Sequence, residues 1–268
     1  MKNTFGFIGC GNMGGALAEA VAKTVLGDNI MVCDSAFDKA ERLGKKCGMQ
    51  VSDLASIVKS CQYIFLAVKP QGAEALFASI CPMLQKRKDP FVLISMLAGT
   101  SISTLEALAG CHCPIIRIMP NTPASVGEGM ILYDYNDSVT ADQLADFSNA
   151  LSEAGRLDHL PEKSIDAASA LSGCGPAFAF LFAEALADAG VECGLTRDQA
   201  NLYAAQTLLG SAKLLLETGK HPGVLKDAVC SPGGTTIAGV HALEDGGFRA
   251  ATINAVTAAY QKTLQLKK

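Results

Sequence analysis

One stretch of the sequence decides the fold: Phe5-Gly6-Phe7-Ile8-Gly9-Cys10-Gly11-Asn12-Met13-Gly14-Gly15. Its apolar beginning predicts a buried strand, and the residues that follow it favour a helix with apolar side chains at helical spacing. Between the two, Gly9 permits a tight turn, Gly11 lets the backbone approach a ligand, and Gly14 lets the helix pack closely on the strand. The free N–H groups at the start of such a helix favour a phosphate.

An acidic residue strengthens this interpretation, because a glycine-rich turn is common and can be purely structural. A second apolar run, residues 30–33, ends in Asp34, twenty positions after Gly14. A carboxylate at that position can accept hydrogen bonds from the ribose of an adenosine. The strand, turn, helix and acid together predict a dinucleotide site that includes Gly9, Gly11, Gly14 and Asp34.

Composition excludes several classes of protein. The 268 residues are 49% hydrophobic and 18% charged, with a net charge of −4, and no cluster of Lys and Arg appears. Nucleic acid and anionic membrane are therefore not expected as partners. The ten cysteines include no Cys-x-x-Cys pair and the four histidines show no metal-ligand spacing, so no metal is expected. We find no signal-peptide pattern and expect a soluble, cytoplasmic protein in a reducing compartment.

The first 160 residues predict a Rossmann-like, doubly wound parallel sheet. Apolar strands alternate with helices, and strands that are apolar throughout imply a sheet covered on both faces. Strands are predicted at residues 4–8, 30–33, 49–51, 63–70, 91–96 and 115–120, with 130–133 as an optional edge strand, and helices at 38–47, 53–60, 71–84, 103–108 and 140–154.

Residues 161–268 predict a second, all-helical domain. The sequence there has no convincing strand pattern, and its helical segments are separated by glycine or proline. Helices are predicted at residues 165–171, 176–191, 197–217, 235–244 and 248–266.

Four further loops contain side chains suited to binding. Val68-Lys69-Pro70 and Arg117–Pro123 each end a predicted strand, where ligands bind in such sheets, although a plain strand end or turn would look similar. In the helical domain, Ser172–Ala177 and Ser231–Thr236 precede helices. The second loop combines hydroxyls with the N–H groups of a helix start and can hold a small carboxylate.

With the glycine turn, these loops occur in an order and spacing that resemble the Δ1-pyrroline-5-carboxylate reductase family, over essentially residues 5–266. The segment from Ser231 to Glu244 is the most specific to that family. The resemblance implies reduction of a cyclic imine, pyrroline-5-carboxylate, to L-proline with NADPH or NADH, the final step of proline biosynthesis. Such hydride addition needs alignment of the two partners and no protein nucleophile.

The resemblance also implies roles for individual residues. Thr236 is expected to hydrogen-bond the ring nitrogen of the substrate and is the catalytic residue, while Ser231 with the backbone of Gly234 and Thr235 would hold the carboxylate. The family usually has serine where Cys174 stands, so one hydrogen bond is in doubt. The residues expected to line the cofactor are Gly11, Asn12, Met13, Val68, Lys69 and Pro70, together with Asn121.

Two expectations concern assembly and cofactor choice. The resemblance implies a homodimer through the helical domain, in which the substrate loop of one subunit completes the site of its neighbour, and rings of dimers also occur. The sequence of residues 176–191 is consistent with a subunit interface, because their apolar side chains cover more than one face of the predicted helix. Asp34 should repel the 2′-phosphate of NADPH, which Lys39 and Arg42 offset in part, so we expect NADH to serve at least as well.

Two rival interpretations share features of this sequence. A β-hydroxyacid dehydrogenase has a similar domain order, but as we read that family it needs an asparagine four positions after a lysine, and no lysine here has one. A non-enzymatic nucleotide sensor would bind the cofactor without needing the Ser231–Thr236 loop.

Overall fold

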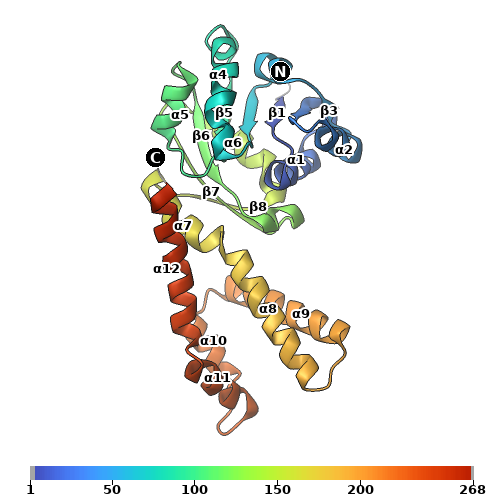
Figure 1. Cartoon of the computed structure of the whole chain (residues 1–268), viewed down its shortest axis with the longest axis vertical. Helices are drawn as coiled ribbons and strands as arrows, with labels where there is room; N and C mark the ends of the chain where they lie inside the picture. The colour runs from blue at the N-terminus through green and yellow to red at the C-terminus, as the bar shows by residue number, and fades with distance from the viewer. Residues whose placement is uncertain (1–3, 267–268) are drawn as a thin grey trace. The chain divides into compact units, whose positions relative to one another are not determined.

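The computed structural model describes residues 4–266 and divides into two compact units (Figure 1). The first contains the chain as far as Gly173 and again from Tyr260, and the second is Cys174–Ala259. Each unit is considered in turn.

An eight-stranded sheet forms the centre of the first unit, in the order β3-β2-β1-β4-β5-β6-β7-β8. Strands β1 to β6 are parallel, β7 runs antiparallel to β6, and β8 pairs parallel with β7. The first six strands have the order of a doubly wound dinucleotide-binding fold, which confirms the predicted fold class. The strands are β1 Phe5–Ile8, β2 Ile30–Cys33, β3 Gln50–Val51, β4 Tyr63–Leu66, β5 Val92–Ser95, β6 Ile115–Met119, β7 Gly129–Tyr135 and β8 Gly155–His159.

Helices cover both faces of this sheet. Residues of α1, α2 and α6 share one buried cluster with alternate strand residues such as Phe5 and Phe7. Residues of α3, α4 and α5 share a second cluster with Ile8 and Ile64, which point to the other face. The helices are α1 Asn12–Thr24, α2 Phe37–Cys47, α3 Leu54–Ser60, α4 Ala73–Leu84, α5 Ile102–Ala109 and α6 Ala141–Ala150.

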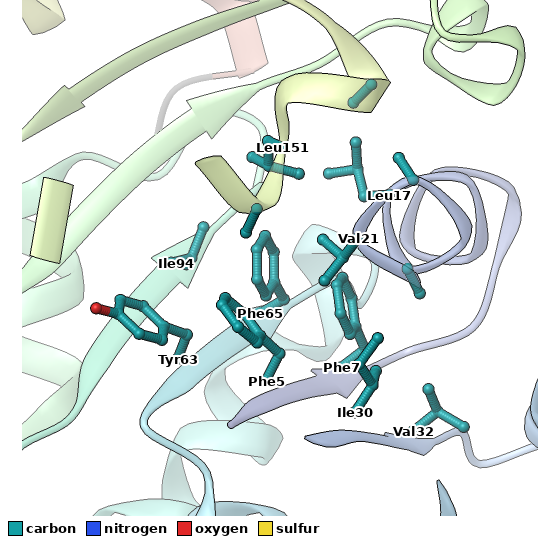
Figure 2. Close-up of a cluster of buried hydrophobic side chains, with 14 of the residues drawn as sticks. Phe5, Phe7, Leu17, Val21, Ile30, Val32, Tyr63, Phe65, Ile94 and Leu151 are labelled. Carbon is teal, nitrogen blue, oxygen red and sulfur yellow. The ribbon is translucent and has the colours of Figure 1, made fainter. Parts of the chain in front are cut away.

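Stacked aromatic rings hold β1 against β4 beneath α1 (Figure 2). The ring centroids of Phe7 and Phe65 are 4.3 Å apart, and those of Phe5 and Tyr63 are 4.9 Å apart. Leu17 and Val21 of α1 pack over the same cluster. Burial of each large apolar side chain stabilises the fold by about 1.5–3 kcal/mol. This packing fixes the start of α1, and with it the glycine turn, at the end of β1.

The sheet differs from the sequence-based expectation at its far edge and in one strand end. Strand β8 was not expected, because Gly155–His159 is polar and half-exposed and pairs only with β7. Strand β7 is therefore longer than residues 130–133 and is not an edge. Strand β4 ends at Leu66, because the backbone beyond it turns into the 3-10 helix η2, Pro70–Gly72.

A further helix, α7 Glu162–Ser172, belongs to the first unit although the expected domain boundary lies at residue 160. The reason is two ion pairs made by one buried arginine. Arg117 of β6 is 3% exposed, and its guanidinium donates to Glu162 Oε1 at 2.9 Å and to Asp166 Oδ1 at 3.0 Å. Unpaired charges are costly in such a place, so α7 is held to the sheet.

The second unit is helical, and no strand occurs in the described chain after His159, as predicted. Helices α8 and α9 pack closely through small residues, with Ala187, Ala200 and Ala204 buried. Helix α10 was not expected, because Pro222 and Gly223 were interpreted as a break. The helices are α8 Gly175–Glu192, α9 Arg197–Thr218, α10 Pro222–Ala228, α11 Thr235–Asp245 and α12 Phe248–Leu266, whose last turns belong to the first unit.

Large apolar side chains lie on the surface of the helical unit. Phe180 is 68% exposed, Leu202 is 63% exposed and Leu216 is 73% exposed. Among the described residues of this unit, the buried apolar side chains are only the three alanines between α8 and α9. A surface of this kind marks a site of interaction.

Candidate active site

The glycine turn after β1 requires glycine at two positions for steric reasons. Gly9 has a φ of +107°, and a Cβ there would lie 2.5 Å from the carbonyl oxygen of Ala67. A Cβ on Gly14 would lie 2.2 Å from the carbonyl oxygen of Gly9 and 2.7 Å from the Cβ of Ala67. The turn is therefore packed against the end of β4, where the strand order reverses.

Gly11 differs from these two glycines, because a Cβ built on it would meet no atom of the described chain within 4 Å. It is the N-cap of α1 and makes no side-chain cap, so the first N–H groups of that helix are free to bind a ligand. The first turn also lacks an acidic residue, and it contains Asn12, which is exposed, and Met13. The open space and the helix dipole suit a phosphate group.

Asp34 follows β2 and joins it to the turn. Its carboxylate accepts hydrogen bonds from the backbone N–H of Cys10 at 2.6 Å and of Ala36 at 2.8 Å. Burial, and next the negative charge of Asp34, raise the pKa of the Cys10 thiol to about 12, so the thiol stays neutral at physiological pH. The carboxylate thus places a negative charge directly at the turn.

A pocket of about 490 Å³ opens beside the turn and carries charges of both signs. Three cationic residues of α2 line it, Lys39, Arg42 and Lys46, and Lys46 donates to Glu19 Oε1 at 2.7 Å. Lys39 and Arg42 were expected, whereas Lys46 and Ser125 were missed. The spacing of the three cations puts them on one face of a helix, which is the signal that could have identified Lys46.

The predicted residues after β4 lie beside the turn. The N–H of Ala67 donates to the carbonyl oxygen of Ile8 at 2.9 Å, so the chain leaves β4 in contact with β1. Val68 is half-buried, and Lys69, which precedes η2, is exposed together with Pro70. The structure therefore brings this loop and the glycine turn together at the carboxyl ends of two adjacent strands.

Asn121 is held by the main chain of the first unit. The residue is buried, its Oδ1 accepts from the N–H of Met130 at 2.9 Å, and its Nδ2 donates to the carbonyl oxygen of Ser172 at 2.9 Å. It directly precedes the 3-10 helix η3, Thr122–Val126, which packs against α1.

The predicted substrate residues belong to the helical unit and form the start of α11. Gly233 has a φ of +68°, and the N–H of Gly234 donates to the carbonyl oxygen of Ser231 at 3.0 Å. Gly234 is the N-cap and makes no side-chain cap, while Thr235 and Thr236 begin the helix with exposed side chains. Hydroxyls and unpaired N–H groups therefore face outward together, which suits a small anion.

Comparison with known proteins relates both units to one family. The model of the NADP oxidoreductase, coenzyme F420-dependent family matches residues 4–99, and that of pyrroline-5-carboxylate reductase dimerisation matches residues 162–266. The second match begins close to the expected domain boundary at residue 160.

Relatives that match this chain over its full length are named pyrroline-5-carboxylate reductase. The chain is 41% identical over 271 residues to pyrroline-5-carboxylate reductase of Escherichia coli (strain K12) and 43% identical over 275 residues to that of Synechocystis sp., with 100% of each chain covered. It is also similar to the crystal structure of Plasmodium falciparum pyrroline carboxylate reductase with NADP bound. That similarity has a TM-score of 0.88 and 33% identity, and covers 99% of this chain and 98% of that one. The motifs, the fold and these relatives together mean that the chain belongs to the pyrroline-5-carboxylate reductase family.

Proposed function

We propose that this protein reduces Δ1-pyrroline-5-carboxylate to L-proline with NADPH or NADH, as the final step of proline biosynthesis. The observation that carries the proposal is the open space over Gly11 at the start of α1, in a chain similar to named reductases over its whole length. A Cβ at Gly11 would occupy the space that a pyrophosphate needs.

The residues of the first unit fit a nicotinamide dinucleotide. The turn from Gly9 to Gly14 and the first N–H groups of α1 would hold the pyrophosphate, and Asp34 would accept from the adenosine ribose. Val68, Lys69 and Pro70 would line the cofactor further along. When bound, the cofactor supplies the hydride, and the protein orients it and excludes water.

The loop at the start of α11 would hold the substrate. Ser231 and the backbone of Gly234 and Thr235 would bind the carboxylate of the cyclic imine. The hydroxyl of Thr236 would accept a hydrogen bond from the protonated ring nitrogen, which stabilises the electrophilic form and fixes which face of the ring is presented. A neutral acceptor does this without forming an ion pair that would weaken the electrophile.

We propose that the protein is a homodimer through its helical unit, that the substrate loop of one subunit completes the site of its neighbour, and that dimers can assemble into rings. The exposed apolar side chains of α8 and α9 support the dimer, as does the matched dimerisation domain. One helical stretch in residues 4–266, Glu162–Glu192, is long and apolar enough to span a membrane. We assign its apolar face to the dimer and not to lipid, because it lies in the matched dimerisation domain, and we place the enzyme in the cytoplasm.

The test is loss of reduced-nicotinamide absorbance on addition of pyrroline-5-carboxylate, run in parallel with NADH and NADPH, with chromatographic detection of proline. We expect imine-dependent oxidation with both cofactors. Binding of NADH without imine-dependent oxidation would reject the reductase and favour the nucleotide sensor.

A further inference from the structure

The end of α7 leaves a carbonyl oxygen without its usual helical partner. Gly173 and Cys174 keep helical backbone angles, with φ and ψ of −76° and −41° and of −88° and −26°. In a continuous helix, the carbonyl oxygen of Ser172 would accept from the N–H of the residue four positions later. That residue is Pro176, which has no N–H.

The side chain of Asn121 supplies the missing donor. Its Nδ2 lies 2.9 Å from the carbonyl oxygen of Ser172, and the residue is only 9% exposed. Its Oδ1 is held at the same time by the N–H of Met130, so the amide has one fixed orientation. Leaving such an acceptor unpaired is costly, so this hydrogen bond fixes the end of α7.

The start of α7 is fixed by the same strand. Arg117 lies in β6 and pairs with Glu162 and Asp166 in the first two turns of α7, while Asn121 follows two residues after the end of β6. Glu162 also accepts from the N–H of Ile102. Arg117 in β6 and Asn121 just after that strand therefore hold α7 at both ends.

Asn121 also begins the segment that reaches the cofactor pocket. It is the N-cap of η3, which packs against α1, and Ser125 of η3 lines the pocket beside the glycine turn. Asn121 thus connects a segment that lines the cofactor pocket with the last residue of α7. The first segment of the compact unit ends one residue later, at Gly173.

We propose that Asn121 is a positioning residue for hydride transfer. By capping Ser172 it fixes the last turn of α7, one residue before the chain leaves the nucleotide-binding unit. The role goes beyond lining the cofactor, since Asn121 acts through Ser172. It rests on the proposed function, because the misalignment it prevents is that of imine and nicotinamide.

The test compares two matched variants of the full chain. Asn121→Asp keeps the acceptor for the N–H of Met130 and replaces the donor to Ser172 with a negatively charged oxygen. Asn136→Asp is the control, because Asn136 accepts from the N–H of Ile115 and donates to Glu106 and to the carbonyl oxygen of Cys113, none of which lies in α7. We expect kcat to fall by about tenfold in Asn121→Asp at saturating substrates, since small misplacements cost large factors in rate. The Kd for NADPH should change by less than about threefold, and Asn136→Asp should keep kcat.

Two further measurements separate this positioning role from a general loss of stability: recovery of kcat in a double variant, and hydrogen exchange of backbone amides. Pro176→Ala restores an N–H opposite Ser172, so the double variant with Asn121→Asp should recover part of the lost kcat. Amide exchange at residues 173–175 and 177 should accelerate in Asn121→Asp and not in Asn136→Asp. Equal kcat loss in both asparagine variants, or unchanged exchange at these amides, would overturn the proposal. A wild-type protein that does not oxidise NADPH with the imine would reject the proposed function instead, and the exchange result would still decide whether Asn121 holds this segment.

Discussion

The carboxylate of Asp34 accepts a hydrogen bond from the backbone N–H of Cys10 across 2.6 Å. The negative charge at the end of β2 is thereby held at the glycine turn. A second bond from the N–H of Ala36 leaves the carboxylate few ways to move away. An adenosine 2′-hydroxyl can donate to such a group, whereas a 2′-phosphate is repelled by it.

The first prediction concerns cofactor choice. We expect NADH to serve at least as well as NADPH in the wild-type enzyme, and Asp34→Ser to shift the ratio of the two kcat/KM values toward NADPH by roughly tenfold, the effect of one charged interaction. Arg42→Ala should move the ratio the other way, because it removes a cation from the pocket. An unchanged ratio in Asp34→Ser would remove Asp34 from cofactor choice.

The glycines of the turn should separate binding from stability. Gly14→Ala should lower the thermal midpoint by several degrees, since its Cβ meets the backbone of Gly9 at 2.2 Å. Gly11→Ala should leave the midpoint unchanged and weaken NADPH binding by roughly tenfold or more, because its Cβ enters the space for the pyrophosphate. Gly15→Ala is the control within α1. Its added Cβ would lie 3.7 Å from the nearest atom, the carbonyl oxygen of Cys10, so the thermal midpoint should not change. Normal NADPH binding by Gly11→Ala would contradict the assignment of the turn.

Thr236 and Thr196 should show opposite effects when replaced by alanine. Thr236→Ala should lower kcat/KM by roughly 10- to 100-fold and leave cofactor binding intact, as expected for a lost hydrogen bond to a charged ring nitrogen. Thr196 accepts from the N–H of Gln199 as the N-cap of α9, so Thr196→Ala should cost about 1 kcal/mol of stability and leave turnover intact. Near-normal turnover with a lowered midpoint in Thr236→Ala would reduce Thr236 to a structural role.

Assembly is tested by placing a charge on the apolar surface. Phe180→Glu should convert the dimer to a monomer in light scattering, because a buried unpaired carboxylate is costly in an interface. Leu26→Glu is the matched control, since Leu26 is 67% exposed, close to the 68% of Phe180, but lies in the first unit. A stable and active wild-type monomer at micromolar concentration is the outcome that would contradict this prediction.

Alkaline pH should destabilise the protein through its buried thiols. Burial raises the pKa of Cys61 to about 11 and that of Cys113 to about 12, from 9.0. Above pH 9 the unfolded thiols lose protons that the folded ones keep, so the free energy of unfolding falls as pH rises toward 11. Each thiol contributes about 1 kcal/mol of this loss by pH 10. Cys61→Ala should flatten the slope in denaturant titrations. Cys193→Ala, at an exposed position, should leave the slope as it is.

The parallel sheet and the helical unit could be predicted, because most of their strands and helices are determined by residues within the element itself. Apolar runs such as Tyr63–Leu66 make buried strands, and Gly48 ends α2 in the left-handed conformation. Strand β8 escaped prediction because its residues are paired by β7, far away in the sequence, and not by any apolar pattern of their own.

The sequence indicates those parts of the candidate site that lie within one short segment. It does not indicate contacts between residues that only folding brings together. The glycine turn and the Ser231–Thr236 loop can be read residue by residue. The bond from Asn121 to Ser172 spans 51 positions, and the bond from Cys10 to Asp34 spans 24, so neither has a local pattern. Arg117 offered a signal, since a charge within a buried apolar strand needs a partner, but nothing in the sequence identified Glu162 or Asp166 as that partner.

The last turns of α12, from Tyr260, belong to the same compact unit as β1. On the ribosome, this segment emerges only after Cys174–Ala259 has been made, so the nucleotide-binding unit stays incomplete while the apolar helices are already exposed. A chain in that state needs protection from aggregation before it can meet a second copy. Order of synthesis thus makes completion of the nucleotide-binding unit one of the last events in folding of the chain.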